Sequence, residues 1–155
     1  SERRRHFGET DQIINRKLKK ALELGLVPVF CVGESPSERE SGKTFDLLQL
    51  QLTVGLEGLR FDEKQLVIAY EPVWAIGTGV NATPQQAAEA HRFLREKLST
   101  LVGAPVAQKI RILYGGSVKV EISDELFAEK ALDGALVGGA SFKAAELVEI
   151  VKKAK

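Results

Sequence analysis

The sequence predicts an α/β fold built around a parallel sheet, with helices that cross from one strand to the next. Two observations predict it. Four short, nearly continuous apolar runs lie along the 155 residues, and stretches with helical periodicity separate them. Such runs are typical of strands buried on both faces, and their alternation with helices indicates parallel pairing. A (β/α) barrel and a doubly wound open sheet both have this pattern.

The expected strands are residues 26–32, 66–70, 110–114 and 135–137. The loop after each of them is rich in polar residues and glycine, which places function at the carboxyl ends of the strands. No linker or repeat divides the chain, and its length suits one domain with a sizeable core. We therefore expect residues 1–155 to belong to a single domain.

The expected helices follow from apolar residues that recur on one helical face. Gly25 is a typical stop for the first helix, and Thr83-Pro84-Gln85-Gln86 is a capping box that begins the third. A further helix is expected around residues 123–129. The apolar faces comprise Ile14, Leu18, Ala21 and Leu22; Phe45, Leu48, Leu52 and Leu56; Ala87, Ala90, Leu94, Leu98 and Leu101; and Val148 and Val151.

Charge and composition exclude several classes of protein. The 22 basic and 21 acidic residues are interleaved, which argues against a nucleic-acid surface. No apolar run approaches the roughly 20 residues that a membrane span needs. The single cysteine, Cys31, forms no internal disulfide and fits a reducing compartment, so we expect a cytoplasmic protein. No zinc-type spacing occurs, and no metal site is expected.

The most informative segment is YEPVWAIGTG, residues 70–79. A carboxylate, Glu71, stands at the carboxyl end of a predicted buried strand, followed by an apolar loop and Gly-Thr-Gly. This pattern suits a base on a rigid element beside a lid with hinges at both ends. The alternative is a glutamate paired with a lysine before an ordinary loop. Exposed Val73, Trp74 and Ile76 weigh against it, because apolar loop residues are costly unless they close over something.

Two glycine pairs form a second constellation. Tyr114-Gly115-Gly116-Ser117 and Val137-Gly138-Gly139-Ala140-Ser141 each follow a predicted strand. Without a Cβ, the backbone N–H groups can approach an oxyanion closely, and loops after consecutive strands can share one phosphate. The alternative is that each pair only makes a tight turn. Cys31, which has no neighbouring histidine in the sequence to activate it, reads as a packing residue.

YEPVWAIGTG, with CVGE, YGGS and VGGAS in that chain order, resembles triosephosphate isomerase, and the resemblance covers essentially the whole chain. It implies a TIM (β/α)8 barrel of which this chain supplies about four βα units, strands five to eight. The implied reaction interconverts dihydroxyacetone phosphate and glyceraldehyde 3-phosphate by proton transfer through an enediol(ate), in glycolysis and gluconeogenesis, with no cofactor. The family usually forms homodimers.

The resemblance also implies roles for individual residues. Glu71 is the general base, and the amides of Gly77, Ser117, Gly138 and Gly139 hold the substrate phosphate. Ser1 holds the base while the lid is open, Glu2 orients a catalytic lysine from another part of the protein, and Tyr114 bonds the closed lid. Glu34 and Arg39 are expected to be structural partners. The lid and its support comprise Pro72, Val73, Trp74, Ala75, Ile76, Gly77, Thr78 and Gly79, together with Gly115 and Gly116.

The family's catalytic lysine, asparagine and histidine have no counterpart in these 155 residues. Four strands also cannot close a barrel that needs about eight. We therefore expect this chain to act as part of a complete enzyme, with a complementing N-terminal half, or with a second copy. The alternative function is a catalytically incomplete phosphate-binding half-barrel or assembly fragment. One departure from the family pattern is Val120, where proline commonly stands.

Overall fold

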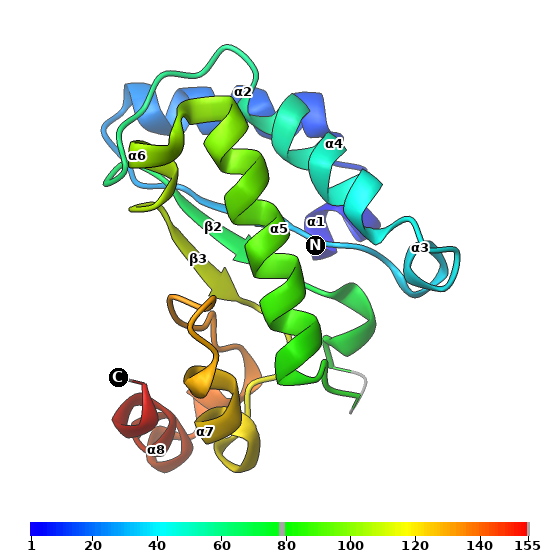
Figure 1. The fold of residues 1–155 in the computed structure, drawn as a ribbon, viewed down its shortest axis with the longest axis vertical. Coiled ribbons are helices and arrows are strands. Elements are labelled where there is room, and N and C mark those ends of the chain that lie inside the picture. The colour runs from blue at the N-terminus through cyan, green and yellow to red at the C-terminus, as the bar shows by residue number, and fades with distance from the viewer. Residues whose placement is uncertain (78–79, 155) are drawn as a thin grey trace.

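Three parallel strands form the sheet, in the order β1 (Val29–Val32), β2 (Val67–Tyr70) and β3 (Arg111–Tyr114). The structure, a computed structural model, describes residues 1–77 and 80–154 (Figure 1). Phe30, Ile68 and Ile112 are aligned across the sheet, so the three strands end at one edge. The three corresponding predicted strands are confirmed, each beginning later than predicted.

The fourth predicted strand, residues 135–137, is present only as a parallel bridge between Ala135 and Tyr114. Leu136 N–H donates to the Tyr114 carbonyl oxygen at 2.8 Å, so the segment still runs beside β3. Within the described ranges, no strand pairs with the edge of residues 135–137 that faces away from β3. A segment flanked by glycines and paired on one side has few contacts to hold it extended.

The helices agree with the prediction for every long element (Figure 1). Helices α1, α3 and α6 were not predicted, since they have six, five and four residues and no apolar periodicity. Two short 3-10 helices, η1 and η2, lie in the loops after β2 and after Ala135. The bounds are α1 (Glu2–Phe7), α2 (Asp11–Glu23), α3 (Pro36–Glu40), α4 (Thr44–Leu56), η1 (Val73–Ala75), α5 (Pro84–Val102), α6 (Ala104–Ala107), α7 (Val120–Ala128), η2 (Gly139–Phe142) and α8 (Ala144–Lys153).

The core lies between the sheet and the layer formed by α2, α4 and α5, which Figure 1 shows side by side. Alternate strand residues point into it, from Phe30 and Val32 in β1 to Ile112 and Tyr114 in β3. The opposite face of the sheet is partly open: Val29 is 45% exposed and Arg111 is also exposed. A closed barrel would enclose this second face.

Most of the predicted helix faces are buried. Leu18 of α2 and Leu48, Leu52 and Leu56 of α4 belong to the core, as do Ala87, Ala90, Leu94 and Leu98 of α5. The capping box at Thr83 and the positive φ of Gly25 are both present.

Two predictions about helix faces are wrong. Leu101 is 41% exposed because it lies in the last turn of α5, beyond the last core position. In α8 the buried residue is Ile150, whereas Val148 and Val151 are 49% and 61% exposed. Helix α8 contacts α7 and η2, and Ile150 is its residue in the core.

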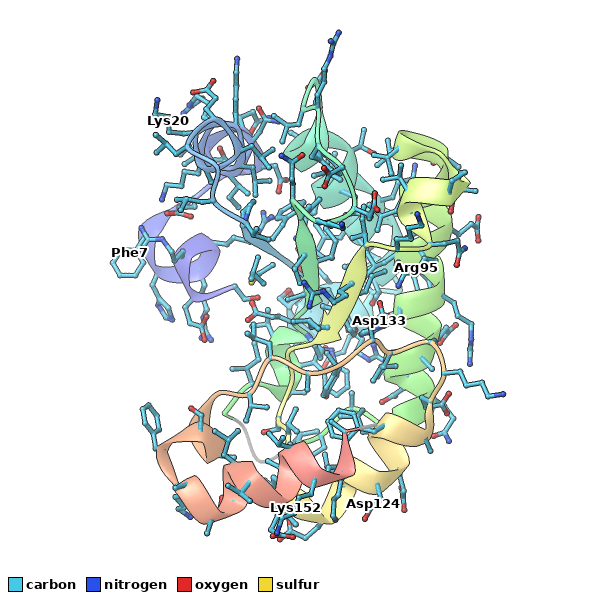
Figure 2. The ribbon with its side chains drawn as sticks, turned by 90° about the vertical axis from the view of Figure 1, so that its left-hand side faces the viewer. Phe7, Lys20, Arg95, Asp124, Asp133 and Lys152 are labelled. Atoms are coloured by element: carbon cyan, nitrogen blue, oxygen red, sulfur yellow. The ribbon has the colours of Figure 1, made fainter. Side chains whose placement is uncertain are left out.

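Asp133 fixes the segment after α7 to the sheet. Its Oδ2 accepts the Ile112 N–H at 2.7 Å and an Arg95 guanidinium N–H, and Figure 2 shows Arg95 and Asp133 directed toward one another. This brings the second glycine loop beside the first. Among the described residues, no helix is long and apolar enough to cross a membrane.

Candidate active site

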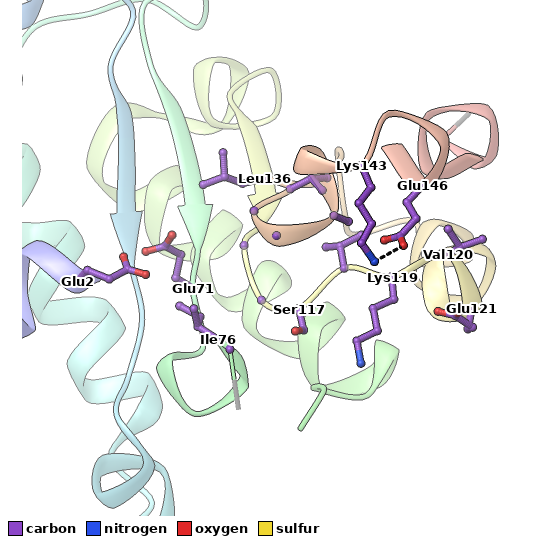
Figure 3. A pocket seen from close by; sticks show the side chains of 18 residues that line it. Glu2, Glu71, Ile76, Ser117, Lys119, Val120, Glu121, Leu136, Lys143 and Glu146 are labelled. Atoms are coloured by element: carbon purple, nitrogen blue, oxygen red, sulfur yellow. Dashed lines mark hydrogen bonds and ion pairs between the residues drawn. The ribbon is translucent and has the colours of Figure 1, made fainter. Parts of the chain in front are cut away.

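Glu71 directly follows β2, and hydrogen bonds on both sides fix its backbone. Its N–H donates to the Val32 carbonyl oxygen at 2.8 Å, and Gly115 N–H donates to the Tyr70 carbonyl oxygen at 2.7 Å. The side chain is 11% exposed. The backbone of Glu71 is therefore fixed, and its carboxylate lies at the carboxyl edge of the sheet, as the sequence predicted (Figure 3).

Close packing around Glu71 requires glycine at two neighbouring positions. A Cβ on Gly33 would lie 1.8 Å from the Glu71 carbonyl oxygen, and a Cβ on Gly115 would lie 2.7 Å from Glu71 Cγ. Real Cβ atoms do not approach so closely, so the missing side chains are what allow β1 and β3 to approach the glutamate.

Ser1 binds the Glu71 carboxylate. Its Oγ donates to Oε2 at 2.6 Å, and its backbone nitrogen lies 2.7 Å from the same oxygen. Glu2 lines the adjacent pocket with its side chain 64% exposed. The predicted placement of Ser1 beside the base is thus found, while the roles of Ser1 and Glu2 in a reaction remain predictions.

A pocket of about 640 Å³ joins Glu71 to both glycine loops (Figure 3). Its lining includes all the residues predicted to hold phosphate, namely Gly77, Ser117, Gly138 and Gly139, together with Ile76, Gly115 and Gly116. Thr78 and Gly79, which the sequence assigned to the lid, lie outside the described residues. A buried carboxylate and two glycine loops thus line one cavity of a size that suits a small ligand.

The amides of the two loops differ in their present partners. The N–H groups of Gly138 and Gly139 make no hydrogen bond in the described part of the chain, and Gly139 begins η2. Ser117 N–H, in contrast, donates to the Ala75 carbonyl oxygen of the lid segment at 3.0 Å. Within the described residues, the Gly138 and Gly139 amides of the second loop are therefore unpaired, whereas the Ser117 amide of the first loop is occupied by Ala75.

A buried carboxylate, Glu34, binds the first residues of the lid segment. Its Oε1 accepts hydrogen bonds from Trp74 Nε1 at 2.8 Å and from the Tyr70 hydroxyl and Arg39 Nη1 at 3.1 Å each. The Arg39 guanidinium also lies over the Trp74 ring, 4.4 Å from its centroid. Val73 N–H donates to the Glu34 carbonyl oxygen at 3.0 Å. These contacts fix Pro72–Ala75 against the end of β1.

The predicted Glu34–Arg39 pair is confirmed, but the contacts of Tyr70 and Trp74 with Glu34 were missed. Those donors lie 36 and 40 residues from Glu34 in the sequence. No local spacing connects them. The one available signal was that all three residues stand at or just after the carboxyl ends of two successive predicted strands.

Burial shapes the titration of groups around the site. The pKa of Cys31 is raised to about 11, first by burial and then by the negative charge of nearby Glu71, which keeps the thiol protonated. Burial also raises the pKa of Tyr114 to about 12. The Ala82 backbone beside the Tyr114 hydroxyl opposes this rise in pKa, and the predicted bond of Tyr114 to a closed lid remains a prediction.

Neither histidine lines the Glu71 pocket. His6 is exposed on α1, and His91 is fully buried in α5 with its pKa lowered to about 4 by burial. Among the described residues, no group of three or more histidine, cysteine, aspartate and glutamate side chains could hold a metal ion.

The sequence has clear relatives. Residues 1–154 match the family model described as triosephosphate isomerase. The chain is 52% identical over 153 residues to a triosephosphate isomerase of Syntrophotalea carbinolica, 54% to one of Carboxydothermus hydrogenoformans and 53% to one of Geotalea uraniireducens. Each alignment covers 98% of this chain and 61% of the relative, so the chain spans about three fifths of the length of these relatives. This chain belongs to the triosephosphate isomerase family.

Proposed function

We propose that this chain provides the base and the phosphate-binding loops of a triose-phosphate isomerase, which interconverts dihydroxyacetone phosphate and glyceraldehyde 3-phosphate. The observation that carries the proposal is that Glu71, Gly138 and Gly139 line one pocket, and that the N–H groups of the two glycines make no hydrogen bond within the described residues. A phosphorylated three-carbon molecule is short enough to bring its phosphate to these amides and its carbon chain to the carboxylate.

In this proposal Glu71 takes a proton from the carbon beside the carbonyl group and returns it to the neighbouring carbon. An enediol(ate) lies between the two transfers, and a positioned carboxylate serves both. The hydrogen bond from Ser1 Oγ occupies one oxygen of the carboxylate. The side chain must turn from Ser1 toward the substrate before it can accept a proton.

Phosphate binding and lid movement are coupled through Ser117. The Ser117 N–H cannot donate a hydrogen bond to the phosphate while it donates to the Ala75 carbonyl oxygen. Arrival of the phosphate therefore favours release of the lid segment from this amide. Closure of the lid, residues 72–79, over the ligand would exclude water from the enediolate and strengthen the electrostatic interactions inside the pocket.

The carbonyl group also needs a donor on the side opposite Glu71. Neither histidine lies in the pocket, and its two lysines lie with the phosphate loops (Figure 3). The proposed partner is therefore the N-terminal half of the barrel, which would cover the partly open face of the sheet, or a second copy of the chain. We further propose that the assembled enzyme is a cytoplasmic homodimer acting in glycolysis and gluconeogenesis.

The test compares isomerase activity of the chain combined with the N-terminal two fifths of a relative, with and without Glu71→Gln. Loss of a general base removes about 10²–10⁴-fold in rate, so E71Q should reduce kcat at least a hundredfold, and E71D should also be impaired. Glu40→Gln is the control, because Glu40 is an exposed carboxylate on α3. Near-normal turnover of E71Q would refute the base assignment.

The second candidate function is a phosphate-binding half-barrel without catalysis. The match of residues 1–154 to the triosephosphate isomerase family favours the isomerase over this candidate. Binding of glycerol 3-phosphate by the chain, without turnover when the N-terminal part is supplied, would support this candidate over the isomerase.

A further inference from the structure

We propose that Lys119 is a side-chain cation that this chain contributes to the phosphate site, in addition to the catalytic lysine expected from the rest of the enzyme. This inference rests on the proposed function, since it concerns the anion that the two glycine loops would hold. The charges that line the pocket motivate it. Four glutamates, Glu2, Glu71, Glu121 and Glu146, face two lysines, Lys119 and Lys143. A pocket with this excess of negative charge repels a phosphate dianion unless a cation is available to meet it.

Lys143 is already engaged. Its Nζ lies 2.7 Å from Glu146 Oε1, and this ion pair raises the pKa of Lys143 (Figure 3). Lys119, in contrast, forms no ion pair with any carboxylate in residues 1–77 and 80–154. A phosphate that meets Lys119 therefore has no protein carboxylate to displace.

The backbone places Lys119 on the same side as the predicted phosphate ligand Ser117. Val118 is 7% exposed and packs in the core, and Lys119 has extended backbone angles, φ −129° and ψ 158°. Alternate side chains of extended backbone point to opposite sides. Val118 lies in the core, whereas Ser117 and Lys119 both line the pocket (Figure 3).

Exposure makes Lys119 suited to reach an incoming anion. The residue is exposed and precedes α7 as its N-cap. A lysine ammonium is a point charge on a flexible stem, so Lys119 can turn toward a phosphate that enters the pocket it lines. Lys119 would thus bind the phosphate directly, and the reacting carbons would remain with Glu71.

The experiment titrates the full chain with glycerol 3-phosphate, a phosphorylated three-carbon molecule that cannot isomerise, and with glycerol as its uncharged counterpart. Lys119→Gln should weaken glycerol 3-phosphate binding about 5-fold at low salt, the upper range for one exposed ion pair. The difference should shrink at about 0.5 M salt, where such charges are screened. Lys119→Arg, which keeps the charge, should bind nearly as wild type.

Lys64→Gln is the matched control, because Lys64 is exposed between α4 and β2 and outside the pocket. Unchanged binding by K119Q, or equal weakening by K64Q, would overturn the role of Lys119. Failure of the wild-type chain to bind glycerol 3-phosphate would overturn the phosphate site itself. Binding that depends on Lys119, without turnover when the N-terminal part is supplied, would refute only the isomerase function.

Discussion

Replacing Glu34 with alanine should destabilise the chain and release the tryptophan of the lid. Glu34 is fully buried, and a single oxygen accepts from Arg39, Tyr70 and Trp74. Breaking a buried ion pair costs about 3–5 kcal/mol. The Arg39 side chain is 30% exposed and can turn to water, so we expect the lower end, about 3 kcal/mol.

The hydroxyl of Tyr70 gives an independent measure of one part of this loss. Tyr70 is 1% exposed, and Tyr70→Phe removes a single donor to Glu34. One hydrogen bond to a charged group contributes about 1.5–3 kcal/mol, so Y70F should lose less than E34A. Since 1 kcal/mol shifts the melting temperature of a chain of this size by about 2–4 °C, E34A should melt about 10 °C below wild type.

The assay is urea and thermal unfolding followed by circular dichroism and by tryptophan fluorescence. Trp74 is the only tryptophan, so its emission reports on the lid segment alone. In E34A the emission should shift to the red before unfolding begins. Glu40→Ala, an exposed carboxylate of α3, should stay within about 0.5 kcal/mol of wild type. An E34A variant with wild-type stability and emission would refute this account of the anchor.

Three further predictions concern buried groups near the sheet. Because the pKa of His91 is about 4 in the folded chain and about 6.5 when unfolded, stability is fully present above pH 6.5 and is lost as the pH falls toward 4. The loss of unfolding free energy should reach about 3 kcal/mol. It should be absent in His91→Gln and present in His6→Gln. An H91Q variant whose stability depends on pH as in the wild type would contradict the prediction. Cys31, with its pKa at about 11, should react slowly with thiol reagents at pH 8, and Glu71→Gln should speed the reaction by removing a nearby negative charge. Rapid labelling of the native wild-type chain would disprove this. Gly115→Ala should displace Glu71 and reduce activity of the assembled enzyme while the chain stays folded, as checked by circular dichroism beside the isomerase assay; full activity would show that the Cβ contact is tolerated.

The strands and long helices could be predicted because their signals are local. Continuous apolar runs and a capping box at Thr83 need no information from distant residues. The faces of Leu101 and α8 could not be predicted in this way. Apolar periodicity identifies a face that is able to pack, whereas burial depends on which elements lie opposite, as the exposure of Val148 and Val151 shows.

The same distinction, between local signals and contacts that depend on distant residues, applies to the candidate site. Glu71 and the two glycine pairs follow strand ends, and parallel strands bring such positions together at one edge, so sequence reasoning could place them in one pocket. The Glu34 contacts join residues far apart in the chain, and the donation from Ser117 to Ala75 depends on how one loop lies over another. Only the three-dimensional structure reveals such contacts.

The shared Ser117 amide has a thermodynamic consequence. Under the proposed function, one N–H proton has two competing acceptors, the Ala75 carbonyl oxygen and an incoming phosphate. A hydrogen bond of about 1 kcal/mol to the first lowers the apparent affinity for the second about 5-fold. Substitutions that strengthen the resting position of residues 73–76 should therefore weaken ligand binding without touching the ligand, and the sequence of this segment sets the concentration at which the pocket fills.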